Sequence, residues 1–176
     1  ASRGLGDVYK RQLIDLATTG GVTFINGLVY GGQDSDTIRI GNSLNASSIG
    51  GNEGADRIFL NSATVLNSTI GAGKGHDIIT TTALAGGLAA TLVTVVGGEG
   101  FDSINITFGA ATNTNLTVFG DVTEGGDSTL GAADFINFSA GGLVELGSSS
   151  VYGGVGNDTI TFGGINAGAG TAIAIK

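Results

Sequence analysis

A glycine-rich turn that ends in aspartate recurs six times along the chain, and it constrains the fold more than any other feature. The copies occupy residues 31–36, 51–56, 72–77, 97–102, a lengthened 120–134, and 153–158. Their final aspartates are separated by 20, 21, 25, 32 and 24 residues. Self-similarity at such a period is typical of solenoids and other repeat architectures. The chain is therefore expected to build one unit repeatedly and to stack the copies.

Each turn is flanked by apolar residues at constant positions. Two residues after every final aspartate stands an isoleucine: Ile38, Ile58, Ile79, Ile104, Ile136 and Ile160. Two residues before every turn stands a valine or isoleucine: Val29, Ile49, Ile70, Val95, Val118 and Val151. The alternate positions after the turn are mostly polar, and a period of two is the pattern of a half-buried strand. The predicted unit is strand, glycine turn, strand and return.

One such unit cannot bury its own apolar residues, but units stacked at about 4.8 Å pair their backbones and align their aliphatic side chains in an interior. Glycine accounts for 34 of 176 residues and proline for none, with abundant Val, Ile and Thr, which suits closely spaced turns and strands. The sequence predicts an all-β protein, a right-handed parallel β-solenoid of about six rungs with stacked Gly/Asp turns.

Two segments are distinguished along the chain. Residues 1–12 contain three of the seven basic residues and no strand pattern, and they resemble a translated sequencing adapter. They are interpreted as a non-native segment. Residues 13–176 are predicted to form a single β-solenoid domain, and the strand pattern that stops at the last residue indicates a fragment of a longer protein.

The charge is concentrated in the turns. The net charge is −8, and most acidic residues lie in the six turns, so that stacking would place them in one column. Carboxylates about 4.8 Å apart repel by roughly 3 to 4 kcal/mol at an effective dielectric constant near 20. Acidic oxygens and turn carbonyls are ligands of a hard cation, and a chain with no cysteine and one histidine is a poor zinc or copper site. Calcium (Ca2+) is the expected ion.

The turns resemble a known family. Residues 153–158, Gly-Gly-Val-Gly-Asn-Asp, followed by Thr159 and Ile160, are similar to the nonapeptide G-G-x-G-x-D-x-U-x of the RTX, or hemolysin-type, calcium-binding repeat proteins. The resemblance implies calcium between stacked turns, held by turn carbonyls and the repeat aspartates: Asp36, Asp56, Asp77, Asp102, Asp134 and Asp158. Asp34, in the first turn, and Asp127, in the insertion of the fifth, are further candidate ligands.

The turns also depart from the family pattern. Single turns alternate with long returns rich in Thr, Ser, Asn and Ala, Asp34 stands where glycine is expected, and Ala72 replaces the first glycine of the third turn. The fifth turn is interrupted by residues 120–127. Weak or missing calcium sites are expected at some of these turns. The composition is closest to the secreted surface-layer (S-layer) and adhesin members. The resemblance then implies type I secretion, an extracellular location, and contacts with other copies or neighbouring domains of the same surface protein.

Other functions are weighed against this interpretation. The acidic charge and the lack of a basic patch argue against nucleic acid as a partner, and no apolar run is long enough for membrane insertion. His76 lies in a turn and is interpreted as a surface residue. No catalytic or organic cofactor-binding residue is expected. The chain is predicted not to be an enzyme.

Two alternatives remain open. The first is a ligand-binding β-solenoid for ice or carbohydrate, with outward threonine rows such as 80–82 and Thr159 with Thr161 as a face, although ordinary solenoid walls carry threonine too. The second is a β-helical polysaccharide-degrading enzyme or a phage tailspike fragment, which would need a carboxylate cluster away from the turns.

Overall fold

The structure is a computed structural model that describes residues 11–16, 23–41, 43–61, 64–84, 92–108, 112–113, 115–121, 132–140, 145–164 and 173–175. All regular secondary structure in these residues is β-strand. None of them belongs to a helix of the length and hydropathy needed to cross a membrane. The described part of the chain is a parallel β-solenoid of about six rungs, which confirms the predicted fold class.

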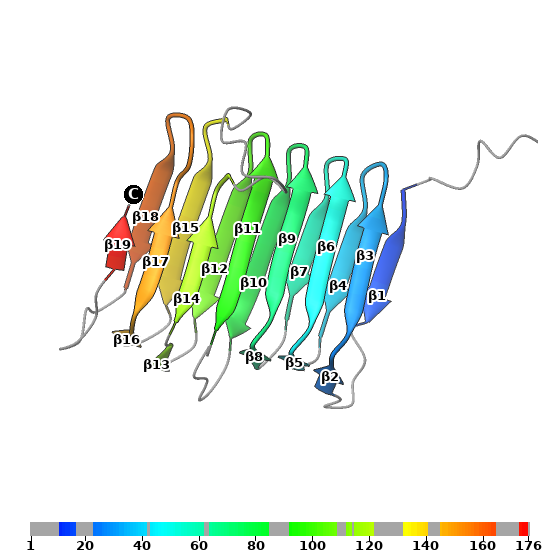
Figure 1. Cartoon of the computed structure of the whole chain (residues 1–176), viewed down its shortest axis with the longest axis horizontal. Helices are drawn as coiled ribbons and strands as arrows, with labels where there is room; N and C mark the ends of the chain where they lie inside the picture. The colour runs from blue at the N-terminus through cyan, green and yellow to red at the C-terminus, as the bar shows by residue number, and fades with distance from the viewer. Residues whose placement is uncertain are drawn as a thin grey trace, which may run out of the picture.

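Two long sheets form the main walls and lie one behind the other in Figure 1. The first sheet consists, in spatial order, of β1 (Leu13–Leu16), β4 (Thr37–Ile40), β7 (Arg57–Leu60), β10 (Ile78–Leu84), β12 (Ser103–Phe108), β15 (Phe135–Ala140) and β18 (Thr159–Gly163). The second consists of β3 (Leu28–Gly32), β6 (Ser48–Glu53), β9 (Thr69–Lys74), β11 (Val93–Glu99), β14 (Leu116–Phe119), β17 (Ser149–Tyr152) and β19 (Ile173–Ile175). All pairings between neighbours are parallel.

Short strands border the edge opposite the glycine turns, at the bottom of Figure 1. They are β2 (Thr23–Ile25), β5 (Ser43–Asn45) and β8 (Val65–Leu66) in one sheet, and β13 (Thr112–Asn113) with β16 (Glu145–Leu146) in another. The glycine turns that the structure describes in full connect strands of the second sheet to the next strand of the first, as from β3 to β4, and lie along the top edge.

Aliphatic ladders fill the interior between the walls. The six isoleucines that follow the turns are in register along the first sheet, and the five from Ile38 to Ile136 are at most 1% exposed. The Val and Ile residues that precede the turns form the matching ladder on the second sheet, where Ile49, Ile70 and Val118 are at most 2% exposed. The strand pattern predicted around each turn is therefore correct, because each inward residue lies beside the equivalent apolar residue of the neighbouring rung.

One predicted outward row is wrong at its centre. Thr81 is 2% exposed and lies in register with Leu60 and Ile106, both buried. Its hydroxyl accepts a hydrogen bond from the backbone N–H of Thr107 at 3.0 Å. Thr80 and Thr82 face outward on either side. Three consecutive strand residues cannot share a face, and the buried hydroxyl is tolerated because it has a backbone partner.

The opposite corner of each rung has its own hydrogen-bond ladder. Asn26, Ala46, Asn67, Leu92 and Asn115 have positive φ of 47° to 59°, a conformation in which asparagine is enriched. Each begins the entry into a strand of the second sheet. The next residue is a serine in two of these rungs. Ser68 Oγ accepts a hydrogen bond from the N–H of Ser47 at 3.1 Å, and Ser47 Oγ accepts one from the N–H of Gly27 at 3.1 Å. This buried serine row was not predicted.

Candidate metal site in the stacked turns

The second, third and fourth glycine turns stack too closely on the preceding turn for a side chain at the tip. Gly54, Gly75 and Gly100 have φ of 131°, 143° and 117°, and Asp34 takes the equivalent place in the first turn with φ of 66°. A methyl group on Gly75 would collide with the carbonyl oxygen of Gly54 in the preceding turn. Glycine is required there both by its backbone conformation and by the approach of a neighbouring backbone.

Replacement of Gly75 by alanine is expected to destabilise the protein by about 2 kcal/mol or more, because both the positive φ and the carbonyl contact resist a Cβ. Gly71 is the matched control, since its φ is ordinary and a methyl there would have nothing within 4 Å. Gly71→Ala should leave stability unchanged or raise it by up to about 1 kcal/mol. Thermal unfolding of both variants tests this, and equal losses would contradict the tight stacking of the turns.

The repeat aspartates form a continuous column on the inner side of the turns. Asp36, Asp56, Asp77, Asp102 and Asp134 are each at most 2% exposed, and Asp158, in the last rung, is partly buried. In each, Oδ1 accepts a hydrogen bond from the backbone N–H one rung earlier, and these N–H groups belong to Gln12, Asp36, Asp56, Asp77, Asp102 and Asp134, at 2.6 to 2.9 Å. Six aspartates from separate rungs are thus joined in one row.

The second carboxylate oxygen of this column is buried without a hydrogen-bond partner. This holds for Oδ2 of Asp36, Asp56, Asp77, Asp102 and Asp134. A buried polar atom without a partner is costly and calls for an explanation such as a bound ion or water.

The first glycine of the turn gives this oxygen its room in every turn except the third, where Ala72 stands at that position. A methyl placed on Gly31 would lie 2.5 Å from Asp36 Oδ2 and 2.9 Å from the carbonyl oxygen of Gly51. The same placement on Gly97 would lie 2.6 Å from Asp102 Oδ2 and 2.5 Å from the carbonyl oxygen of Gly120. A carboxylate oxygen and the carbonyl of the next rung therefore face the same side of the glycine.

The column holds its carboxyls in an environment that opposes ionisation. Burial raises the pKa of Asp102 to about 8, the backbone N–H of Asp77 opposes that rise, and the neighbouring carboxylates add to it. Burial likewise raises the pKa of Asp134 to about 7 and those of Asp56 and Asp77 to about 6. The buried carboxylates therefore destabilise the folded state unless protons or a cation compensate their charge.

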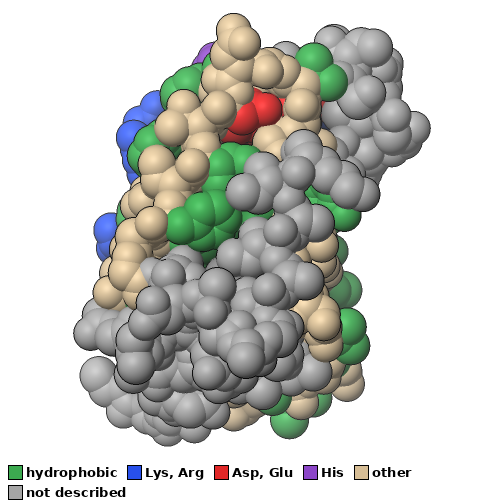
Figure 2. Space-filling view, turned by 90° about the vertical axis from the view of Figure 1, so that its left-hand side faces the viewer, with side chains coloured by type: hydrophobic (Ala, Val, Ile, Leu, Met, Phe, Trp, Pro, Cys, Tyr) green, Lys and Arg blue, Asp and Glu red, His purple; other side chains and the backbone are tan. Residues whose placement is uncertain are grey.

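Figure 2, which looks onto the end of the solenoid that carries β18 and β19, shows acidic side chains enclosed between the walls near the turn edge, with hydrophobic side chains below them. The carboxylates are therefore interior groups and not part of an exposed acidic strip. Their oxygens and the turn carbonyls form a hard, all-oxygen donor set, which fits Ca²⁺ better than softer metals.

The other predicted ligands are placed differently. Asp34 is exposed on the outside of the first turn and does not join the column. Asp127 lies outside the described residues. His76 is exposed, with its ring 6.3 Å from that of Phe101. Ala72 is 1% exposed, so its methyl occupies the room that glycine leaves in the other turns.

Asp121 belongs to the interior and was not predicted as a site residue. It is 9% exposed, its Oδ2 accepts a hydrogen bond from Val155 N–H at 2.9 Å, and its Oδ1 is buried without a partner. Burial raises its pKa, and the carboxylate of Asp158 adds to the rise. One sequence feature sets Asp121 apart: it directly follows Gly120, at a position where the other turns have glycine or asparagine.

Within the described residues, no three His, Cys, Asp or Glu side chains group together as a metal site. A cation in the column would therefore draw several of its ligands from backbone carbonyls. Comparisons with protein-family models, with curated proteins and with solved structures found no match to this chain. The fold and the site together define a parallel β-solenoid with an interior aspartate column beneath stacked glycine turns.

Proposed function

We propose that this chain is a structural calcium-binding repeat domain of a secreted bacterial cell-surface protein, of the S-layer or adhesin kind, whose folding is coupled to Ca²⁺. The observation that carries the proposal is the row of buried carboxylate oxygens without partners, Oδ2 of Asp36, Asp56, Asp77, Asp102 and Asp134. All of these oxygens except that of Asp77, whose turn begins with Ala72, lie beside a glycine that leaves room for them. An isolated carboxylate in such a place is unfavourable, and a cation that it helps to hold removes the penalty.

The repeat aspartates have two separate tasks in this proposal. Oδ1 fixes the spacing of adjacent rungs by accepting a backbone N–H, as Asp102 does from Asp77. Oδ2 remains for the cation, together with carbonyls such as that of Gly120. Bound calcium would supply the positive charge that the column lacks. Calcium accepts six to eight oxygen ligands in flexible geometry, whereas magnesium demands a near-ideal octahedron and gives up water reluctantly, so the buried turns favour calcium.

The proposed location follows from the resemblance to RTX repeats and from calcium availability. Extracellular calcium modules bind with a Kd of about 10⁻⁴ to 10⁻³ M. A chain whose column is neutralised only at such concentrations would remain loosely folded where calcium is scarce and complete its fold outside the cell. The partners are then calcium ions and neighbouring copies or domains of the same surface protein, and we propose no catalytic role.

The test is thermal unfolding of the chain, followed by circular dichroism, in chelator, in about 10 mM Ca²⁺ and in about 10 mM Mg²⁺. Calcium should raise Tm and strengthen the β-sheet signal, and magnesium should do so much less. A site at 100 times its Kd contributes about 2.7 kcal/mol. Equal unfolding in calcium and in chelator would overturn the proposal.

Asp102→Asn locates the effect in the column. The amide keeps the shape of the side chain but removes the charge. The increase in unfolding free energy that calcium causes should therefore be about 3 kcal/mol smaller in this variant than in the parent. In chelator the same variant should be as stable as the parent or more stable, because it no longer buries a carboxylate. The control is Asp15→Asn, which removes one charge from an exposed carboxyl 3.8 Å from Arg39. Equal calcium responses of the two variants would place the ion elsewhere.

A further inference from the structure

A groove of about 640 Å³ crosses the outer face of the second sheet, on the side of the wall away from the aspartate column. It spans strands β3, β6, β9 and β11. Its lining is mixed: a tyrosine ring with its hydroxyl, two aliphatic side chains, two further hydroxyls, an amide, three charged side chains and bare backbone. A cavity of this size with few convergent polar groups is typical of a small-ligand site.

Glycines form the floor of the groove. Outward positions of the four strands are in register as Tyr30, Gly50, Gly71 and Val96. The ring of Tyr30 lies over Gly50, since a methyl there would be 2.6 Å from Tyr30 Cδ1. At Gly71 the corresponding space is open, with nothing within 4 Å. The sheet surface is therefore hollow at Gly71. The tyrosine ring over Gly50 borders the hollow one rung before, and Val96 borders it one rung after.

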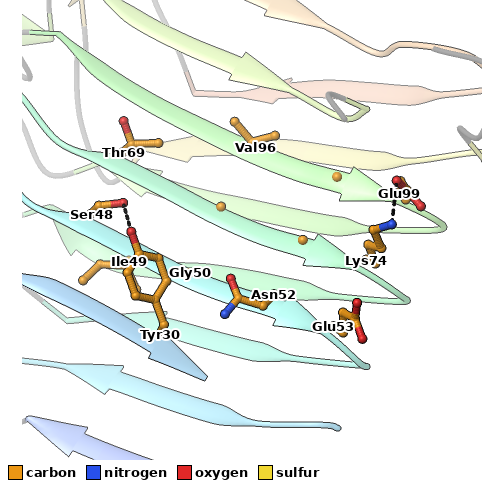
Figure 3. A pocket seen from close by; sticks show the side chains of 13 residues that line it. Tyr30, Ser48, Ile49, Gly50, Asn52, Glu53, Thr69, Lys74, Val96 and Glu99 are labelled. Atoms are coloured by element: carbon orange, nitrogen blue, oxygen red, sulfur yellow. Dashed lines mark hydrogen bonds and ion pairs between the residues drawn. The ribbon is translucent and has the colours of Figure 1, made fainter. Parts of the chain in front are cut away.

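Polar groups border the hollow along both sides, as Figure 3 shows. Ser48 and Thr69 carry hydroxyls on one side, and Tyr30 Oη lies 3.4 Å from Ser48 Oγ. On the turn side lie Asn52, Glu53, Lys74 and Glu99. Lys74 Nζ is 3.4 Å from Glu99 Oε1, so the cation on this rim already has an anionic partner. The lining thus lacks the cluster of unpaired cations that a phosphate or sulfate would need.

We propose that this groove binds a short, neutral, linear oligosaccharide that lies across the strands. Tyr30 is 49% exposed, and an aromatic ring with a polar tip suits a sugar, which has an apolar C–H face and a rim of hydroxyls. Hydroxyl, amide and carboxylate groups on both sides can donate to and accept from those hydroxyls. The rungs repeat at about 4.8 Å, close to the length of one pyranose ring, so that successive sugars meet successive strands. The proposal does not depend on calcium binding.

The experiment titrates the ¹⁵N-labelled full chain with cellotetraose, chitotetraose and maltotetraose, each to about 10 mM. At least one of the three should cause saturable amide shifts with a Kd of about 1 mM or tighter, confined to β3, β6, β9 and β11. No saturable shift with any of the three, or shifts centred on another face, would overturn the proposal. Groove shifts that depend on protein concentration alone would assign the face to a second copy of this chain instead.

Two variants distinguish a site from a passive surface. Tyr30→Ala should weaken binding about tenfold or more, which corresponds to 1.4 kcal/mol per factor of ten. Phe59→Ala removes an outward aromatic ring from the first sheet, where Arg39 lies 5.8 Å from the ring centroid, and should leave binding unchanged. Equal effects of the two variants on binding would overturn the assignment.

Gly71→Val fills the floor of the groove. Valine suits a strand, occupies the same row at position 96, and meets no atom within 4 Å of its Cβ. Tm should therefore stay constant or rise while saccharide binding is lost. Should the valine variant fail to fold, Gly71→Ala gives a smaller obstruction for the same comparison. Unchanged affinity in a folded Gly71 variant would overturn the proposal.

Discussion

In chelator, acidification from about pH 8 to about pH 5 should stabilise this protein, by several kcal/mol in total. Acid usually weakens folded proteins, because it protonates carboxylates that the native state holds ionised. In this protein the native state instead favours the protonated form of its buried carboxyls. The pKa values of Asp56 and Asp77 are raised to about 6, that of Asp134 to about 7 and that of Asp102 to about 8, in each case chiefly by burial.

The sign follows from proton binding. An unfolded aspartate has a pKa near 3.8, so between pH 4 and 8 the folded column binds more protons than the unfolded chain does. Stability is then fully present below about pH 4 and is lost as pH rises through 6 to 8. A shift of two units at one carboxyl corresponds to about 3 kcal/mol, and coupling between neighbours makes the total less than the sum. For a chain of this length, several kcal/mol is a Tm increase on the order of 10 °C.

The control for this prediction is Asp102→Asn, which lacks the carboxyl with the highest of these pKa values and should show a flatter dependence of Tm on pH. Calcium should also flatten it, because a cation bound at the column competes with protons. A Tm that falls on acidification in chelator would contradict a buried and partly protonated column. So would an Asp102→Asn variant whose Tm depends on pH as steeply as that of the parent.

The second large effect is expected at the aromatic end of the core. Phe138 is fully buried and stacks between Phe108, at 6.2 Å between ring centroids, and Phe162, at 4.9 Å, with interplanar angles of 4° in both pairs. Phe138→Ala should lower the free energy of unfolding by about 3 to 5 kcal/mol, since it removes the ring and leaves a cavity between two rungs. Urea or thermal unfolding measures the loss.

Phe101→Ala is the matched control for the same chemical change. Phe101 is 49% exposed in a turn, and its truncation should cost less than about 1 kcal/mol. Phe138→Leu, which retains most of the apolar volume, should fall between the two. Similar losses for Phe101 and Phe138 would mean that the stacked rings contribute no more than a surface contact.

Much of this architecture could be predicted from local sequence. The period of the turns, the isoleucine two residues after each aspartate and the β-branched residue two before each turn predict the strands and their register. They suffice because identical units stacked in parallel must bring identical positions together, as Ile58 meets Ile38 and Ile79. The insertion lengthens the fifth turn in sequence and leaves the pairing of β12 with β15 intact.

The candidate site could be predicted only in part. The sequence placed six aspartates in one column, but it did not reveal that their side chains point into the solenoid, nor that Oδ1 of each is occupied by a neighbouring backbone N–H. Asp34 and Asp36 look equivalent in sequence, yet one is exposed and the other is 1% exposed. The difference arises because Asp34 sits at the turn tip, where φ is positive, while Asp36 immediately precedes strand β4 with its side chain buried.

Sequence alone determined that this chain repeats, that its repeats are β-strands joined by glycine turns, and that its acidic residues gather at those turns. These properties depend on near neighbours in the chain. Only the tertiary structure decided which oxygens are buried without partners, that Asp121 joins the interior, and that Gly71 and Tyr30 shape a hollow on the outer wall. Each of these depends on atoms 20 or more residues away along the chain, whose positions are set by stacking.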